Sequence, residues 1–126
     1  MTQVNVRYMV GDVVAAADWY VGHLGFSRTP MASPAFAAVE RGPVRLLLSG
    51  ELSSAGRAMP DGRRPEPGGW NRLQLVLEDL AAEVERLRSE GVSFRNEIIS
   101  GPGGSQILAE DPSGNVVELF QPANWA

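Results

Sequence analysis

The stretch DPSGNVVELFQP, residues 111–122, joins a turn to an apolar strand. Asp-Pro followed by Gly-Asn is typical of a tight turn. The residues after the turn are apolar except for Glu118, and a strand this apolar is usually buried on at least one face. A carboxylate in such a strand needs a partner, and the candidates are a basic side chain of the protein or a hydrogen-bond donor on a ligand, both of which we favour over a role as catalytic base.

The composition is that of an ordinary soluble globular protein. The 126 residues carry a formal net charge of −4, which disfavours nucleic acid and anionic membranes as partners. The lack of cysteine excludes disulfides and thiolate chemistry. Neither a signal peptide nor a membrane-spanning run is visible, so we expect a cytoplasmic protein.

One arrangement of strands and helix occurs twice. Residues 4–10 alternate between two faces, as in a strand, and Asp12 then caps a helix that ends near Leu24. Residues 71–77 alternate in the same way, and Asp79 caps a second helix. Further strands are expected at 35–40, 44–49, 92–97, 105–110 and 115–121, with a hairpin turn at 101–105. The sequence therefore predicts two modules that each contain one strand, one helix and three strands.

The two modules are separated by a stretch of different composition. Residues 51–69 are rich in Gly, Pro, Ser and Arg and show no apolar period. Loops of this length are uncommon inside compact domains and are often functional. We place the first module at 1–50 and the second at 70–122, within a single domain that spans 1–126.

Three segments in this order resemble the vicinal oxygen chelate superfamily, the fold of glyoxalases, bleomycin-resistance proteins and ring-cleaving dioxygenases. They are GDVVAAADWYVGHLGF at 11–26, EDLAAEVERLRSEGVSF at 78–94 and DPSGNVVELFQP at 111–122. The resemblance covers nearly the whole chain. It implies an α+β fold of two βαβββ modules, with mixed sheets that form a partly open cup and helices on its outer face. It also implies a homodimer.

The resemblance also identifies the positions that hold a metal ion in some members of the family. These positions correspond to Asn5, Leu46, Arg72 and Glu118, and only Glu118 is a suitable ligand. Leu46 has no donor atom, and the charge of Arg72 would repel a cation. We therefore expect no metal, no cofactor and no catalytic residue. Arg72 and Arg7 are the candidate partners of the Glu118 carboxylate, and a carboxylate beside a guanidinium is a poor general base.

The cup is expected to bind an organic ligand, although the same residues could form a closed core under the loop. The predicted ligand-binding surface is apolar and partly aromatic, with a few polar groups, as is usual for such pockets. It consists of Asn5, Arg7, Met9, Phe36, Leu46, Leu48, Trp70, Arg72, Gln74, Leu108, Glu118 and Phe120. Trp70 either stacks on a planar ligand or packs against the loop or a partner chain.

These expectations favour a binding protein over an enzyme. The first hypothesis is a metal-independent protein that sequesters a bulky, largely aromatic antibiotic or related metabolite and thereby confers drug resistance. The alternative is an enzyme of the lyase, isomerase or dioxygenase type with a degenerate metal site.

Overall fold

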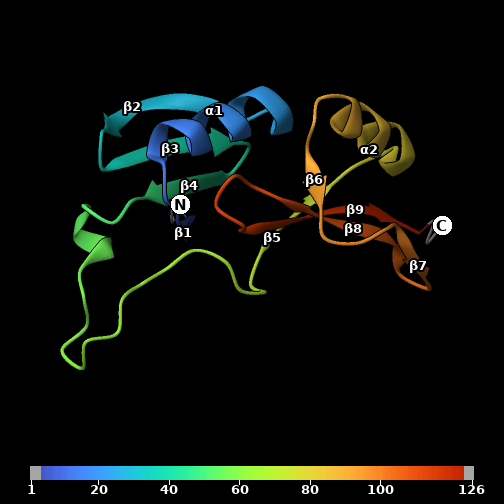
Figure 1. The fold of residues 1–126 in the computed structure, drawn as a ribbon. Coiled ribbons are helices and arrows are strands. Elements are labelled where there is room, and N and C mark those ends of the chain that lie inside the picture. The colour runs from blue at the N-terminus through green and yellow to red at the C-terminus, as the bar shows by residue number, and fades with distance from the viewer. Residues whose placement is uncertain (1–3, 124–126) are drawn as a thin grey trace. The chain divides into compact units, whose positions relative to one another are not determined.

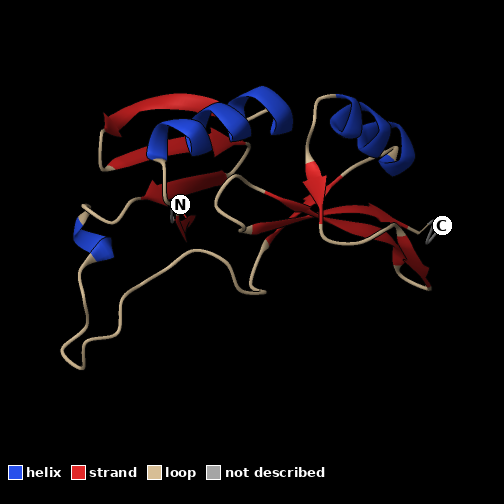
Figure 2. Cartoon of the chain, viewed as in Figure 1, coloured by secondary structure: helices blue, strands red, loops and turns tan. Residues whose placement is uncertain are grey.

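The computed structural model describes residues 4–123, which form two compact units. The first unit extends to Gly68 and includes the turn Pro112–Asn115, whereas the second comprises Gly69–Asp111 and continues from Val116. Each unit contains one α-helix and one mixed sheet (Figures 1 and 2), so the predicted α+β class is confirmed. Neither sheet closes into a barrel within these residues, and none of their helices is long and apolar enough to cross a membrane.

The first unit contains a sheet of four strands in the order β1-β4-β3-β2. Its elements are β1 (Val4–Met9), α1 (Val13–Leu24), β2 (Ser27–Ser33), β3 (Phe36–Arg41), β4 (Val44–Ser49) and the 3₁₀ turn η1 (Ser54–Gly56). Strand β1 is parallel to β4, and the other pairs are antiparallel. The parallel pair is possible because α1 provides the crossover between β1 and the rest of the sheet.

Helix α1 begins and ends where the sequence predicts. The Asp12 side chain accepts a hydrogen bond from Ala15 N at 3.0 Å, and Gly25 closes the helix with a φ of 70°. The helix packs its apolar stripe on the sheet, where Tyr20 is fully buried and its ring lies 6.4 Å from that of Tyr8. Burial of one such large side chain stabilises the fold by about 1.5–3 kcal/mol.

The second unit repeats this plan with one additional short strand. Its elements are β5 (Leu73–Val76), α2 (Leu80–Ser89), β6 (Ser93–Phe94), β7 (Ile99–Gly101), β8 (Gly104–Glu110) and β9 (Val116–Pro122). The strand order is β5-β9-β8-β6, and β7 pairs with β8. The predicted turn at 101–105 is confirmed, because β7 and β8 form a hairpin in which Gly101 is opposite Gly104. Asp79 caps α2 by accepting from Ala82 N at 3.1 Å.

Two strands are absent from the sequence prediction. Strand β2 has the sequence SRTPMAS, which contains a proline and does not alternate. Among the described residues it lies at the sheet edge and pairs with β3. Strand β7 has three residues, too few for a period to be visible. The predicted strand at 71–77 is shorter in the structure, because β5 covers Leu73–Val76.

The connection between β4 and β5 has little regular structure, as predicted. It contains η1 and a turn in which Met59 N donates to Arg63 O at 2.7 Å. Gly56 is required at the end of η1, because a Cβ atom there would lie 2.4 Å from the Glu51 carbonyl oxygen. Figure 1 shows this connection as a long excursion of the chain, drawn in green to yellow.

Candidate functional site

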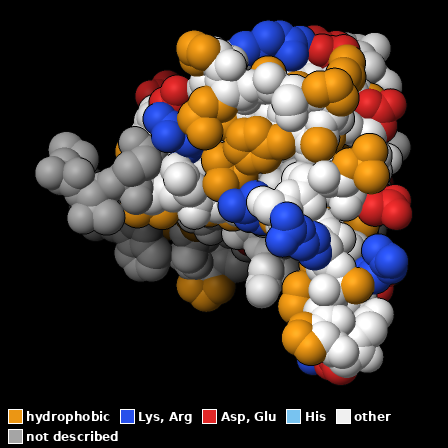
Figure 3. Space-filling view, turned by 90° about the vertical axis from the view of Figure 1, so that its left-hand side faces the viewer, with side chains coloured by type: hydrophobic (Ala, Val, Ile, Leu, Met, Phe, Trp, Pro, Cys, Tyr) orange, Lys and Arg blue, Asp and Glu red, His pale blue; other side chains and the backbone are white. Residues whose placement is uncertain are grey.

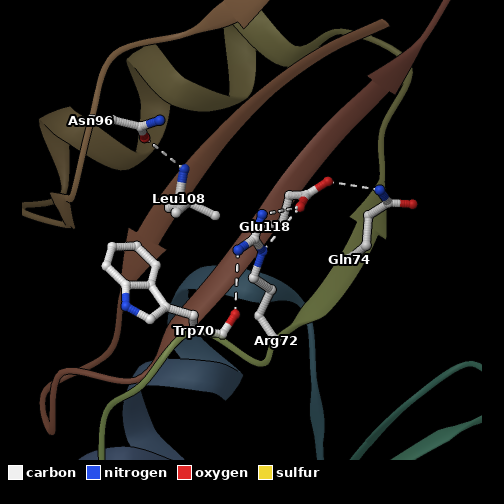
Figure 4. A network of polar contacts seen from close by, with 6 residues as sticks. All are labelled: Trp70, Arg72, Gln74, Asn96, Leu108 and Glu118. Atoms are coloured by element: carbon white, nitrogen blue, oxygen red, sulfur yellow. Dashed lines mark hydrogen bonds and ion pairs between the residues drawn. The ribbon is translucent and has the colours of Figure 1, made fainter. Parts of the chain in front are cut away.

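Glu118 is buried, and both of its carboxylate oxygens accept hydrogen bonds (Figure 4). Arg72 donates to Oε1 from Nε at 3.0 Å and from Nη2 at 2.9 Å. Gln74 donates to Oε2 from Nε2 at 2.7 Å. The glutamate side chain is 8% exposed and that of Arg72 is 28% exposed, so the pair is largely removed from water. Of the two predicted partners of Glu118, Arg72 is therefore confirmed.

The sheet register explains why these groups meet. Gln74 on β5 and Leu108 on β8 are the direct neighbours of Glu118 on β9. Neighbours in register project to the same face of a sheet, and Phe120 joins them because it lies two residues further along β9. This face of the second unit thus presents a neutralised ion pair among amide and apolar side chains.

Trp70 and Arg95 extend the same face. The Arg95 guanidinium lies over the Trp70 ring, 4.6 Å from its centroid, and Arg95 Nε donates to Glu110 Oε2 at 3.2 Å. The Trp70 carbonyl accepts from Arg72 Nη1 at 3.3 Å, so the backbone at this tryptophan is tied to the Glu118 cluster. The Trp70 side chain is nevertheless exposed, with 66% of its surface open to solvent. Such an indole, held on one side by a cation, can stack on a planar molecule.

The sheet face of the first unit carries a second set of predicted residues. Arg7 on β1 donates from Nη1 to Ser49 Oγ on β4 at 2.8 Å, which places both on one face. Asn5 and Met9 share this face with Arg7 because they lie two residues away along β1. Phe36 on β3 is the register partner of Ser49 and belongs to the same face. Arg7, the other predicted partner of Glu118, is thus bonded to a serine instead.

The prediction that Leu46 and Leu48 project to the ligand-binding face is wrong by one residue. Their register partners on β1 are Val6 and Tyr8, which project toward α1, and both leucines are fully buried. They belong to the core of the first unit, and Leu47 and Ser49 occupy the face with Arg7. The run VRLLLS is apolar at three successive positions, so its sequence does not show which leucines face the helix.

Cavities open on the first unit near the end of β1 and beside Arg7. One, of about 400 Å³, is lined by Arg7, Ser33, Ala35, Phe36, Ser53 and Ser54. Another, of about 280 Å³, lies between the end of β1 and the connection and is lined by Met9, Val10, Gly11, Glu51, Gly56, Arg64, Pro65, Glu66 and Pro67. Figure 3 shows one face of the molecule, on which hydrophobic side chains gather with basic side chains beside them. Such mixed surfaces suit organic ligands that carry polar groups.

The turn at 112–115 holds the first unit together. Asn115 is buried, donates from Nδ2 to Met9 O at 2.7 Å and accepts from Gly68 N at 2.8 Å through Oδ1. Ser113 Oγ accepts from Gly11 N at 2.9 Å. The end of the long connection is therefore fixed beside the end of β1 by the Gly-Asn turn that precedes Glu118.

Comparison with known proteins identifies the family. The model of the glyoxalase/bleomycin resistance protein/dioxygenase superfamily matches residues 2–119. The chain belongs to this superfamily. A comparison with curated protein sequences gave no match.

Solved structures of this superfamily share the fold over nearly the whole chain. A member from Sphaerobacter thermophilus is 25% identical, with a TM-score of 0.76 and coverage of 96% of this chain and 97% of that one. TnmS3, an antibiotic-binding protein from a Streptomyces species, is 28% identical, with a TM-score of 0.71 and 98% coverage of both chains. A lactoylglutathione lyase from Agrobacterium tumefaciens is 19% identical, with a TM-score of 0.73 and coverage of 95% and 92%, which shows the fold alone.

The residues at the metal positions of the superfamily do not fit a divalent cation. Both oxygens of Glu118 are engaged by cationic or amide donors, and the Arg72 guanidinium lies at a second ligand position. Leu46, the third position assigned by the resemblance, faces α1 in the core, and its neighbour Leu47, which lies on the face with Arg7, also has no donor atom. Across residues 4–123, no three histidine, cysteine, aspartate or glutamate side chains gather at a spacing that would hold a metal ion.

Sequence reasoning missed two residues of these clusters. Arg95 follows a two-residue strand and is one of several arginines in the second unit, so no pattern singles it out. Asn115 is part of the quoted turn motif, but its contacts with Met9 and Gly68 join positions 106 and 47 residues apart in the chain. The sequence did give one indication of a role for Asn115: it is a polar residue that directly precedes a buried strand.

Proposed function

We propose that this chain is a metal-independent binding protein that sequesters a bulky, largely aromatic small molecule such as an antibiotic. The observation that carries the proposal is the Glu118 cluster. Its carboxylate is held by Arg72 and Gln74, so it is neither a free base nor an open metal ligand. The acidic position of the superfamily thus serves here to orient polar groups on a surface.

The surroundings of the cluster support binding of an aromatic molecule. Trp70 and Val76 are largely exposed, and Phe120 is partly exposed, so apolar area beside the ion pair is available to a ligand. Burial of such area contributes roughly 25 cal/mol per Å² before the costs of association. The Arg72–Glu118–Gln74 network would fix the orientation of the ligand without requiring chemistry on it.

The similarity to TnmS3 supports the same class of function, because that protein is described as antibiotic-binding and is 28% identical over 98% of both chains.

We extend the proposal to a homodimer, since each unit leaves sheet edges unpaired within residues 4–123 and exposed edges favour pairing with another chain. The ligand contacts that we propose lie on the sheet face of each unit taken by itself: Asn5, Arg7, Met9 and Phe36 on the first, and Trp70, Arg72, Gln74, Leu108, Glu118 and Phe120 on the second.

Native mass spectrometry against a panel of polycyclic aromatic antibiotics tests the proposal, with the bound compound recovered and compared with its starting form. We expect a stoichiometric complex in which the compound is unchanged.

Tryptophan fluorescence gives a second test. Binding should quench the fluorescence of Trp70. The Trp70→Phe variant should therefore lose most of the quenching, and Trp19→Phe, the matched control on α1, should keep it. Trp70→Ala should weaken binding by about 2- to 10-fold, as expected for loss of one aromatic contact. Recovery of a modified compound would favour the enzyme alternative.

A further inference from the structure

Two arginines on the sheet face of the first unit lack an acidic partner. Within residues 4–123, no carboxylate lies within ion-pair distance of Arg7 or Arg45, whereas Arg28, Arg72 and Arg95 each have one. Arg7 donates one N–H group to the Ser49 hydroxyl, and its guanidinium has further N–H donors. Arg7 is exposed, so these donors are accessible to a molecule that reaches the face.

Arg45 adds a second cation to this face. It is the register partner of Asn5, and Arg7 is the partner of Leu47, so the two arginines are diagonal neighbours on adjacent strands. Their Cα atoms are roughly 8 Å apart by ordinary strand spacings. Arg45 Nε is buried and has no hydrogen-bond partner among the described residues. Glu40 is opposite Arg45 on β3 but forms no ion pair with it in this part of the chain. A buried donor of this kind is ordinarily satisfied by an ordered water or a bound ion, and Arg45 does not line the cavity beside Arg7, so it acts on that cavity through its charge alone.

The cavity beside Arg7 combines this charge with an aromatic ring and hydroxyl groups. Its volume of about 400 Å³ falls within the range of small-molecule sites, and Phe36 forms part of its lining. Ser33 Oγ accepts from Ala35 N at 3.3 Å, which leaves its O–H group for an acceptor on a ligand. Ser54 contributes another hydroxyl from η1. Guanidinium and hydroxyl donors around a ring are the chemistry that recognises an aromatic acid.

We infer that this face selects aromatic molecules that carry a carboxylate, with the acid on Arg7, the ring against Phe36, and Arg45 adding attraction. The inference rests on the proposed function and specifies the ligand class. All eleven basic residues of the chain are arginines, and a guanidinium binds a carboxylate through two parallel hydrogen bonds. The net charge of the chain is −4 and Glu40 lies opposite Arg45, so the feature that favours an acid is the guanidinium of Arg7 in the cavity lining.

A matched pair of probes tests the inference. Anthracene-2-carboxylate and anthracene-2-carboxamide share the ring and differ in charge, and their binding is measured by fluorescence titration of the whole chain. We expect the acid to bind about 10- to 100-fold more tightly than the amide, as for a charge-assisted pair. Arg7→Gln should reduce this preference to within about threefold, and Arg7→Lys should retain part of it. Arg28→Gln, which removes an exposed arginine that pairs with Asp18 in the same unit, is the control and should keep the full preference.

Each outcome separates the inference from the proposed function. Equal binding of acid and amide by the native chain overturns the inference while leaving the proposed function in place. An acid preference that survives in Arg7→Gln also overturns it, and circular dichroism of that variant shows whether its fold is native. Loss of the preference in both Arg7→Gln and Arg28→Gln would assign it to overall charge and not to this face. If neither probe binds while a polycyclic aromatic antibiotic does, the inference fails and the proposed function stands.

Discussion

Replacement of Glu118 by glutamine tests whether the Glu118 cluster is a structural ion pair. The substitution keeps the size of the side chain and removes its charge. The amide oxygen of the new side chain could still accept from Arg72, but its amide nitrogen would face the Gln74 nitrogen that now donates to Oε2 at 2.7 Å. A flip of the Gln74 amide restores that hydrogen bond, so the lasting loss is the charge on the acceptor of Arg72.

The expected cost follows from the burial of the pair. Because Glu118 is 8% exposed and Arg72 28% exposed, solvent replaces little of the lost interaction. Hydrogen bonds to charged groups contribute about 1.5–3 kcal/mol, and breaking a buried pair outright costs about 3–5 kcal/mol. Glu118→Gln should therefore lower the free energy of unfolding by about 1–3 kcal/mol. At about 4 °C per kcal/mol for a chain of this size, the melting temperature should fall by roughly 4–12 °C.

Urea unfolding followed by circular dichroism measures this change. Glu97→Gln is the matched control, because Glu97 also pairs with an arginine, Arg88, but is 85% exposed and should change stability by less than about 0.5 kcal/mol. A double-mutant cycle with Arg72→Gln should give a coupling energy of at least about 1 kcal/mol. If Glu118→Gln is as stable as the control and the coupling is near zero, the reasoning on this cluster is refuted. Ligand affinity should stay within about tenfold, or roughly 1.4 kcal/mol, because the carboxylate orients other groups.

Three further predictions concern the connection and the assembly. Asn115→Ala should destabilise the first unit by about 1–3 kcal/mol and speed hydrogen exchange near Gly68. The reason is that Met9 O and Gly68 N lose their hydrogen bonds to the Asn115 side chain. Asn71→Ala, at an exposed position, is the control and should have no such effect. The amides of 51–69 should become protected when a polycyclic aromatic compound binds; tight binding with unchanged exchange would show that the connection is not a lid. Sedimentation should show a homodimer at micromolar concentration, and a monomer alone would contradict the proposed assembly.

The fold was predictable where local chemistry is explicit. Asp12 and Asp79 mark both helix starts because an N-cap side chain leaves a clear signal, and the alternating residues of β1 and β5 mark their strands. Strand β2 could not be predicted, since its pairing with β3 depends on backbone hydrogen bonds and not on an apolar period. Tertiary pairing, rather than local preference, decides such edge strands.

The site was predictable to a similar extent. The pairing of Arg72 with Glu118 followed from the need of a buried carboxylate for a partner. The facing of Leu46 and Leu48 did not follow, because a run of leucines fits either face of a strand and α1 decides between them. The contact of Arg95 with Trp70 depends on a two-residue strand that no sequence period reveals.

Under the proposed function, the chain binds an aromatic molecule without a metal ion. The most direct measurement compares binding of the same polycyclic aromatic antibiotics by metal-stripped protein and by protein supplied with divalent ions, with metal content and the recovered compound analysed by mass spectrometry. We expect equal affinity in both preparations, less than stoichiometric metal and an unchanged compound. Binding or conversion that appears only with a stoichiometric, tightly held divalent ion would contradict it.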